Sequence, residues 1–363
     1  MGAVFLAGLI IGTAGASASE KVSADENVAE AAVGDMEAAA GDTKTAAEAA
    51  VPAEGVTGEA DGPWKEAEAV ILTDMIEMTG ETAAQEVTGQ QEEAETDLLN
   101  DFVSRYGTVV PRDLSDKECI KALAELAEQY PEFEPIYEAW EDYPMELLVA
   151  LCNNPEMVDF VAGYLDADTE TAGELTEAEV GRDFPYYLQW DERWGYLPYG
   201  ASCLGLSGCG PTCLSMVVVA LTDNAEASPA AIGEFAMENG YYMSGTGTKW
   251  ALMTKGAASF GVIGTELLTT TSEEDLLDLL EEGYPVICSV KAGDFTNGGH
   301  FIVLAGVEDG QIRVYDPNSV ERSSRLWDYE TLRKQMKKMW VFEAAERGGL
   351  SMKLPVIDAA SGE

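Results

Sequence analysis

The chain has 363 residues, with 66 acidic and 21 basic side chains, a formal net charge of −45, six cysteines and one histidine. A charge this negative excludes proteins that follow nucleic-acid phosphates, because those proteins need Lys and Arg to displace counterions. It also excludes electrostatic docking on an anionic membrane. A single histidine excludes His-rich metal centres, whereas Cys–His catalysis needs only one. The length indicates two or three structural units.

The first 19 residues resemble a secretory signal segment. Met1–Ala14 is an apolar run that is shorter than the roughly 20 residues needed to span a bilayer. Ala16-Ser17-Ala18 fits the small-residue pattern of a cleavage site. No basic residue precedes Lys21, so the usual positive start is missing, and a disordered apolar end is the alternative. We expect an exported protein, either extracellular or associated with the cell surface.

The next segment, residues 20–96, is predicted to be a disordered acidic linker. It is dominated by Ala, Glu, Gly and Thr, and it cannot bury enough apolar surface to offset the entropy of ordering the chain. Residues 20–100 hold 21 acids and 3 bases, whereas residues 182–343 hold 22 acids and 12 bases. Residues 101–181 hold 20 acids and 4 bases. We therefore interpret residues 20–181, which include a helical segment, as a soluble, self-repelling spacer that precedes the last large block.

Residues 97–166 are predicted to form a small helical unit, because their apolar residues recur at spacings of three and four. Cys119 and Cys152 lie on apolar helix faces and are expected to be small buried hydrophobes. An acidic segment, Asp166–Glu179, joins this unit to the next. The expected helices are Asp97–Tyr106, Asp116–Tyr130, Phe133–Trp140, Met145–Cys152 and Glu156–Leu165.

Residues 182–343 are long enough to build a full hydrophobic core. The expected order is helices first and antiparallel strands afterwards, which favours an α+β fold over alternating β-α-β units. Residues 344–363 are interpreted as a tail. The expected helices are Pro211–Leu221, Pro229–Asn239, Lys249–Phe260, Glu273–Glu282 and Tyr329–Lys337, and the expected strands are Pro285–Val290, His300–Val307, Gln311–Asp316 and Met339–Glu343.

Cys209 is the first candidate for chemistry. It lies in Ser207-Gly208-Cys209-Gly210-Pro211-Thr212, and Pro211 suits the first turn of a helix. A cysteine at a helix N-terminus is favoured as a thiolate, because the free N–H groups and the helix dipole stabilise negative charge. The flanking glycines would let a substrate backbone approach closely. The alternative is that this segment is only a tight turn.

His300 and Asp316 are the second and third candidates. His300 opens a strand after a glycine turn, and Asp316 ends the next strand, so both lie at the open end of one hairpin. There a carboxylate can orient the imidazole. A strict two-residue turn at Asp309-Gly310 would put the two side chains on opposite faces, so this interpretation requires a three-residue loop or a bulge. Asn318 is the alternative orienting residue.

Gln189 is the fourth candidate. A side-chain amide upstream of a nucleophilic cysteine can complete an oxyanion hole with the backbone N–H of Cys209. The alternative for a glutamine between aromatic residues is ordinary loop packing.

The order of these four signals resembles a known family. Gln-x-Asp-x-x-Trp, Gly-Cys-Gly-Pro-Thr, Gly-His-Phe and Asp-Pro-Asn follow one another within about Phe184–Glu343. This order is similar to that of the papain-fold cysteine peptidases related to the bacteriocin-leader (double-glycine) peptidases, peptidase family C thirty-nine, and to their stand-alone exported members. The resemblance implies a papain-like fold with Cys209 as nucleophile, His300 as general acid and base, Asp316 as its orienting residue and Gln189 as oxyanion donor. It implies a peptide or cell-wall peptide as substrate. We expect no cofactor, no metal, no nucleic-acid partner and, as a departure from the namesake peptidases, no transporter and no membrane-spanning domain.

Several alternatives remain beside this hypothesis. Cys203, Cys209, Cys213 and His300 could ligate zinc, although only Cys209-x₃-Cys213 has a suitable spacing. Six cysteines in an exported chain leave room for disulfides. The domain could act as a transpeptidase or amidase on cell-wall peptides, or as a catalytically silent binding module at the cell surface. In the glycine-rich loop at 244–248, Thr248 is expected to cap the following helix.

Overall fold

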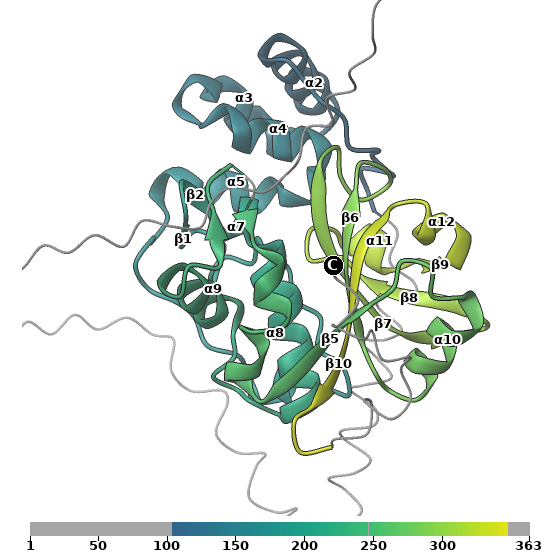
Figure 1. The fold of residues 1–363 in the computed structure, drawn as a ribbon. Coiled ribbons are helices and arrows are strands. Elements are labelled where there is room, and N and C mark those ends of the chain that lie inside the picture. The colour runs from purple at the N-terminus through teal and green to yellow at the C-terminus, as the bar shows by residue number, and fades with distance from the viewer. Residues whose placement is uncertain (1–103, 246, 348–363) are drawn as a thin grey trace, which may run out of the picture. The chain divides into compact units, whose positions relative to one another are not determined.

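A six-stranded antiparallel sheet organises the described part of the chain, residues 104–245 and 247–347, in this computed structural model (Figure 1). The strand order is β5-β10-β6-β7-β8-β9. The predicted signal segment 1–19, the linker 20–96 and residues 348–363 of the tail lie outside the described residues. The strands are β5 Val262–Leu267, β6 Val286–Lys291, β7 Gly299–Glu308, β8 Gln311–Tyr315, β9 Leu326–Trp327 and β10 Met336–Ala344.

Most helices precede this sheet in the sequence, so the predicted α+β fold is confirmed. Two small two-stranded ribbons accompany them, β1 Pro198–Tyr199 with β2 Ser202–Cys203, and β3 Tyr242–Met243 with β4 Gly247–Thr248. The α-helices are α2 Asp116–Gln129, α3 Glu134–Glu138, α4 Met145–Asn153, α5 Val158–Gly163, α6 Glu177–Val180, α7 Leu204–Ser207, α8 Cys209–Thr222, α9 Pro229–Glu238, α10 Glu273–Glu281, α11 Val320–Ser323 and α12 Tyr329–Arg333. The 3₁₀ turns are η1 Pro131–Phe133, η2 Trp140–Asp142, η3 Pro155–Met157, η4 Tyr164–Asp166, η5 Trp250–Met253 and η6 Ala257–Phe260.

Helix α8 is the central helix of the fold. Its residues from Gly210 to Val219 are all buried, because it packs against the sheet on one side and against α9 on another (Figure 1). Alternate residues of the buried strands face this helix, as Phe301 and Val303 do in β7. Ile302 and Leu304 lie on the opposite face with α10 and α12. The sheet is thus buried on both faces, which fixes its register strongly.

The helices of residues 116–163 have a core that extends into the later block. Tyr196 and Cys203 belong to the same buried cluster as residues of α2, α4 and α5. The Phe160 and Tyr196 rings stack with centroids 4.5 Å apart, and the Tyr196 hydroxyl donates to the Phe160 carbonyl over 2.9 Å. The spacer interpretation is therefore wrong for these helices, which pack on the following residues.

Two expected helices differ in the structure. Lys249–Phe260 forms the separate 3₁₀ turns η5 and η6, because the backbone leaves helical geometry at Thr254, with φ −118° and ψ −78°, and the Gly256 N–H donates to the Ala251 carbonyl, five residues back. Consequently Thr248 does not cap a helix, and its hydroxyl lies 2.8 Å from that of Tyr199. The helix expected at Tyr329–Lys337 ends at Arg333, and the chain continues as strand β10.

Two further differences lie at the start of the described chain and in the sheet. Ser104–Tyr106, the described end of the helix expected at Asp97–Tyr106, is not helical, and Gly107 turns the chain at a φ of +70°. Strand β5 was not expected from the sequence, because only its two end residues, Val262 and Leu267, are buried.

Candidate active site

His300 and Asp316 meet at the start of β7 and just beyond the end of β8. His300 Nε2 lies 2.7 Å from Asp316 Oδ1, and both side chains are buried. Burial alone would raise the pKa of Asp316, but Arg322 and His300 outweigh it and lower that pKa to about 2. Asp316 is therefore an ionised carboxylate that holds one nitrogen of the imidazole, and the ring keeps its other nitrogen for a second partner.

A β-bulge brings these two side chains to one face. The hairpin has the two-residue turn Asp309-Gly310, both at positive φ, with Glu308 paired to Gln311. Such a turn alone would put His300 and Asp316 on opposite faces. The register shifts between Leu304 and Gly306, and one further step in the shifted register sets Asp316 opposite Ile302, on the same face as His300. The expected bulge is thus present, in place of a longer loop.

Arg322 completes the surroundings of Asp316. Its Nε donates to Asp316 Oδ2 over 2.5 Å, and its side chain is also buried. The sequence analysis did not identify this residue. The sequence offered one sign of it: Ser319, directly after Asp-Pro-Asn, is a residue type that begins helices. In the structure Ser319 caps α11 by accepting from the Arg322 backbone N–H. The buried carboxylate is therefore held between two cationic groups.

Asn318, the alternative orienting residue, contributes through its backbone. Its N–H donates to Asp316 Oδ1 over 2.8 Å, and its carbonyl accepts from the Trp190 indole over 3.0 Å. The contact with the His300 ring is made by Asp316. The geometry thus favours Asp316 over Asn318 as the orienting residue.

Cys209 is the first residue of α8, directly after the N-cap Gly208. Glycine is required on both sides by close packing. A Cβ at Gly208 would lie 2.5 Å from the Leu204 carbonyl oxygen, and one at Gly210 would lie 2.6 Å from Thr248 Oγ1. The neighbouring chain thus approaches this end of the helix closely, and Cys209 itself is the partly exposed residue between them.

Cys209 is the second partner of His300. Burial alone would lower the pKa of His300, but the Asp316 carboxylate and the nearby Cys209 side chain outweigh it and raise that pKa to about 9. Because Asp316 occupies Nε2, the nitrogen available to the sulfur is Nδ1. The structure therefore aligns a thiol, an imidazole and a carboxylate in the order that thiolate–imidazolium chemistry requires.

Gln189 is buried beside this group. Its Nε2 donates one hydrogen to the Gly205 carbonyl over 2.8 Å, which leaves the second amide hydrogen for another acceptor. Its backbone N–H donates to the Pro317 carbonyl over 2.7 Å, next to Asp316. Gln189 is thus tied both to the loop that leads to Cys209 and to the loop that carries Asp316.

The other five cysteines are buried and none forms a disulfide. Burial raises the pKa of the Cys203, Cys213 and Cys288 thiols. Cys119 and Cys152 are buried as expected, and their sulfurs lie 3.8 Å apart. Cys209 is the partly exposed thiol of the chain. Among the described side chains, no group of three or more His, Cys, Asp or Glu is arranged to hold a metal ion.

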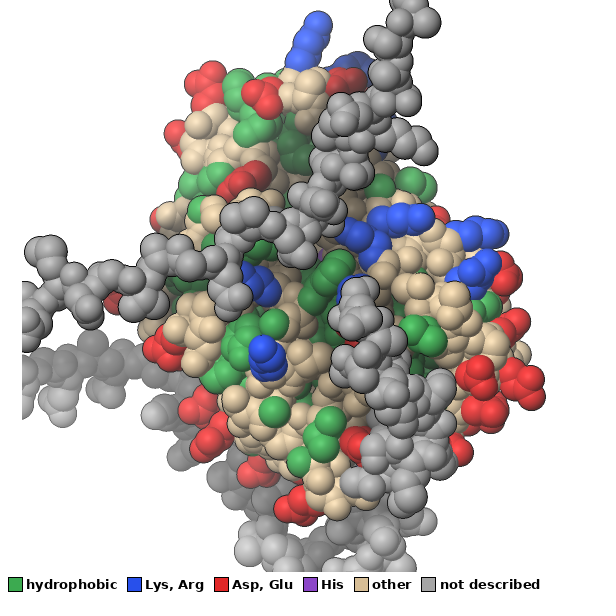
Figure 2. All heavy atoms as spheres, in the orientation of Figure 1, with side chains coloured by type: hydrophobic (Ala, Val, Ile, Leu, Met, Phe, Trp, Pro, Cys, Tyr) green, Lys and Arg blue, Asp and Glu red, His purple; other side chains and the backbone are tan. Residues whose placement is uncertain are grey.

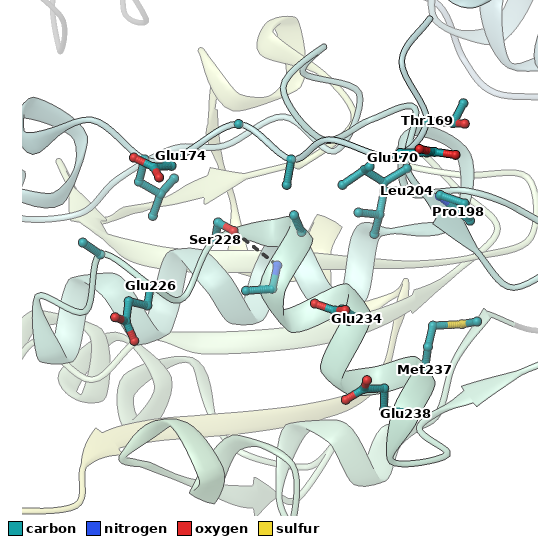
Figure 3. Close-up of a pocket in the computed structure, with 17 residues that line it drawn as sticks. Thr169, Glu170, Glu174, Pro198, Leu204, Glu226, Ser228, Glu234, Met237 and Glu238 are labelled. Atoms are coloured by element: carbon teal, nitrogen blue, oxygen red, sulfur yellow. Dashed lines mark hydrogen bonds between the residues drawn. The ribbon is translucent and has the colours of Figure 1, made fainter. Parts of the chain in front are cut away.

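A hollow of about 730 Å³ has none of the four candidate residues in its lining (Figure 3). It lies between the 169–175 segment and α9, with Leu204 and Pro198 at one side and exposed glutamates such as Glu234 and Glu238 at the other. Cys209, His300, Asp316 and Gln189 therefore lie outside this hollow, and the candidate active site is the group that they form.

Comparison with known proteins adds one finding. Residues 182–347 match the model of the Peptidase_C39 like family. No curated protein and no solved structure matches the chain. The matched range contains Gln189, Cys209, His300 and Asp316, and such a family suggests a cysteine peptidase. Residues 182–347 of this chain are therefore a domain of the Peptidase_C39-like family.

Proposed function

We propose that this protein is a cysteine peptidase in which Cys209 is the nucleophile, His300 the general acid and base, and Asp316 the residue that orients His300. The observation that carries the proposal is the buried 2.7 Å contact between His300 and Asp316, with Cys209 at the N-terminus of α8 close enough to raise the pKa of His300. The position of Cys209 beside this buried pair also argues against a silent binding module, which has no need to keep a thiol near an oriented imidazole.

The reaction follows from the charges of these groups. The Cys209 sulfur attacks the carbonyl carbon of the scissile peptide bond, and the imidazolium of His300 gives its proton to the leaving amine as the C–N bond breaks. A water molecule then attacks the resulting thioester, His300 accepts its proton, and the thiolate leaves. The backbone N–H of Cys209 and the second amide hydrogen of Gln189 are the donors proposed for the oxyanion.

The proposed substrate is a peptide outside the cell. The family supports a peptide substrate, and the signal-like sequence of residues 1–19 supports export. Within the described residues, no helix has the length and apolarity needed to cross a membrane. On the face shown in Figure 2, Lys and Arg side chains lie among hydrophobic ones, and Asp and Glu lie mainly round the margin.

The test uses iodoacetamide on the intact protein, with the modified cysteines identified by peptide mapping. We expect Cys209 to be alkylated much faster than Cys203 near pH 6.5, because an ordinary thiol with a pKa of about 8.5 is only about 1% ionised there. His300→Ala should slow Cys209 at least tenfold and leave Cys203 unchanged. Equal rates for the two cysteines, or no effect of His300→Ala, would contradict the mechanism.

A peptide-library digestion then tests the activity itself. The wild-type protein should release new amino termini, whereas Cys209→Ala should release none. Cys288→Ala is the matched control, since Cys288 is buried in β6, and it should cleave like the wild type. Ligation products that appear when an amine is added would instead assign the same thiol to transpeptidation.

A further inference from the structure

The helical unit, residues 104–166, contacts the loops on which the candidate catalytic groups stand. A spacer or an independent module would be free to pack elsewhere on the domain. Most of the polar contacts of this unit with the rest of the chain instead fall on residues 297 and 318–321, which flank His300 and Asp316 in the sequence. Two others join Phe160 to Tyr196 and Glu146 to Ser202. The unit is therefore attached mainly at the segments next to His300 and Asp316.

The strongest of these contacts joins Glu156 to α11. Its Oε2 accepts the Val320 N–H over 2.8 Å, and its Oε1 accepts the Glu321 N–H over 3.0 Å. Hydrogen bonds from backbone N–H groups to a carboxylate are charge-assisted and stronger than neutral ones. The following residue of α11 is Arg322, whose guanidinium holds Asp316. Glu156 is therefore three links from the imidazole, through α11, Arg322 and Asp316.

A second contact lies beside the first. The Asn154 side-chain amide donates to the Asn318 carbonyl, which also accepts from the Trp190 indole. The N–H of Asn318 donates to the same carboxylate oxygen that contacts His300. The helical unit thus holds the segment after Asp316 at three consecutive peptide groups, from 318–319 to 320–321.

Two more contacts concern the other catalytic groups. Phe160 lies against Gly205, where a Cβ would come within 2.4 Å of its ring, and the Gly205 carbonyl is the acceptor for Gln189. The Asp113 carboxylate accepts from the Asn297 side-chain amide over 2.8 Å, three residues before His300. The helical unit therefore also contacts the acceptor of Gln189 and the loop that precedes His300.

We propose that the helical unit is a built-in brace of the active site, and that Glu156 is a positioning residue that acts on His300 through Arg322 and Asp316. This inference rests on the proposed function. It assigns no contact with substrate to the helical unit. It predicts that a change far from Cys209, outside the matched family domain, alters the titration of His300 and the reactivity of Cys209.

The test compares Glu156→Gln with Glu132→Gln. Glutamine keeps the shape of Glu156 but turns one acceptor into an NH₂ group that faces a backbone N–H of α11. Glu132 is the matched control, because its carboxylate accepts from the Tyr106 hydroxyl over 2.8 Å and pairs with Arg105 at 3.0 Å, both within the helical unit. Its loss should weaken the unit without touching α11.

Two measurements are made on each full-length variant. The first is the rate of Cys209 alkylation by iodoacetamide at pH 7, which should fall at least about tenfold in Glu156→Gln, since small misplacements of catalytic groups have effects of this size. The second is the pKa of His300 by NMR titration. It should fall in Glu156→Gln, because the contact with Asp316 that raises it is no longer held in place, and stay unchanged in Glu132→Gln.

The outcomes separate the two proposals. If wild-type Cys209 reacts no faster than Cys203, the proposed function is wrong. If it reacts fast and Glu156→Gln matches the wild type in both measurements, the brace is wrong. If Glu156→Gln does not fold, Asp113→Ala on the exposed side of the unit takes its place, and a Cys209 rate equal to that of wild type contradicts the brace.

Discussion

Replacement of Asp316 by Asn is the sharpest perturbation of the site, because it removes a charge without changing the shape of the side chain. The carboxylate is fully buried between His300 and Arg322. The amide that replaces it cannot neutralise either cation. The variant therefore separates the electrostatic role of Asp316 from its packing.

The structure sets the expected size of the effect. Arg322 stays buried, at 3% exposure, and loses its ionic partner. Removal of one partner of a buried ion pair costs about 3–5 kcal/mol, because the remaining charge is uncompensated. For His300, burial lowers the pKa and Asp316 raises it, so without the carboxylate the pKa should fall towards or below its ordinary value of 6.5. At pH 7 the imidazole would then be neutral, and peptide cleavage should fall by about 10²- to 10⁴-fold.

Urea denaturation measures the stability, and the lone histidine of the chain gives a single imidazole NMR signal for its pKa. The double variant Asp316→Asn/Arg322→Leu is the control. It should recover part of the lost stability, because no unpaired charge is left, and recover none of the activity. If Asp316→Asn keeps full stability and a His300 pKa near 9, the described charge arrangement is wrong.

Three other changes test separate parts of the site. The folded-state pKa of His300, about 9, lies above the ordinary value of 6.5. Protonation of His300 therefore adds on the order of 3 kcal/mol to the free energy of unfolding below pH 6.5, and this contribution is lost as the pH rises through 9. Urea denaturation should show a more stable protein at pH 6 than at pH 9.5, and His300→Ala should remove most of the difference. Gln189→Ala should lower kcat about 10²- to 10³-fold and leave the alkylation rate of the thiol unchanged; an equal loss in both would make Gln189 a packing residue only. Gly205→Ala should destabilise the fold by about 1–3 kcal/mol in thermal unfolding, because the added methyl group meets the Phe160 ring, whereas Gly306→Ala, with no atom near its Cβ position, should cost less; equal shifts would contradict the close packing.

The sequence was sufficient where a local pattern determined the outcome. The glycines and proline around Cys209 predicted a helix N-terminus, and the structure begins α8 at that residue. The parity argument between His300 and Asp316 predicted a longer loop or a bulge, and the structure has the bulge. Both predictions rested on backbone geometry within about twenty residues.

The sequence was insufficient where distant segments meet. Strand β5 is defined by its pairing with β10, some 75 residues away, and its own residues show little alternation of burial. The position of the Arg322 side chain beside Asp316 depends on the short helix α11. The contact of Glu156 with that helix joins residues more than 160 positions apart. Local periodicity carries no information about such contacts, so the helical unit was interpreted as part of a spacer.

Titration of His300 by NMR in the wild type and in Cys209→Ala tests the central claim most directly. The claim is that Cys209 and His300 form one thiolate–imidazolium pair supported by Asp316. The account predicts a pKa of about 9 in the wild type and a clearly lower value in Cys209→Ala, because one of the two side chains that raise the pKa of His300 is removed. A wild-type pKa near 6.5, or the same value in both proteins, would contradict it.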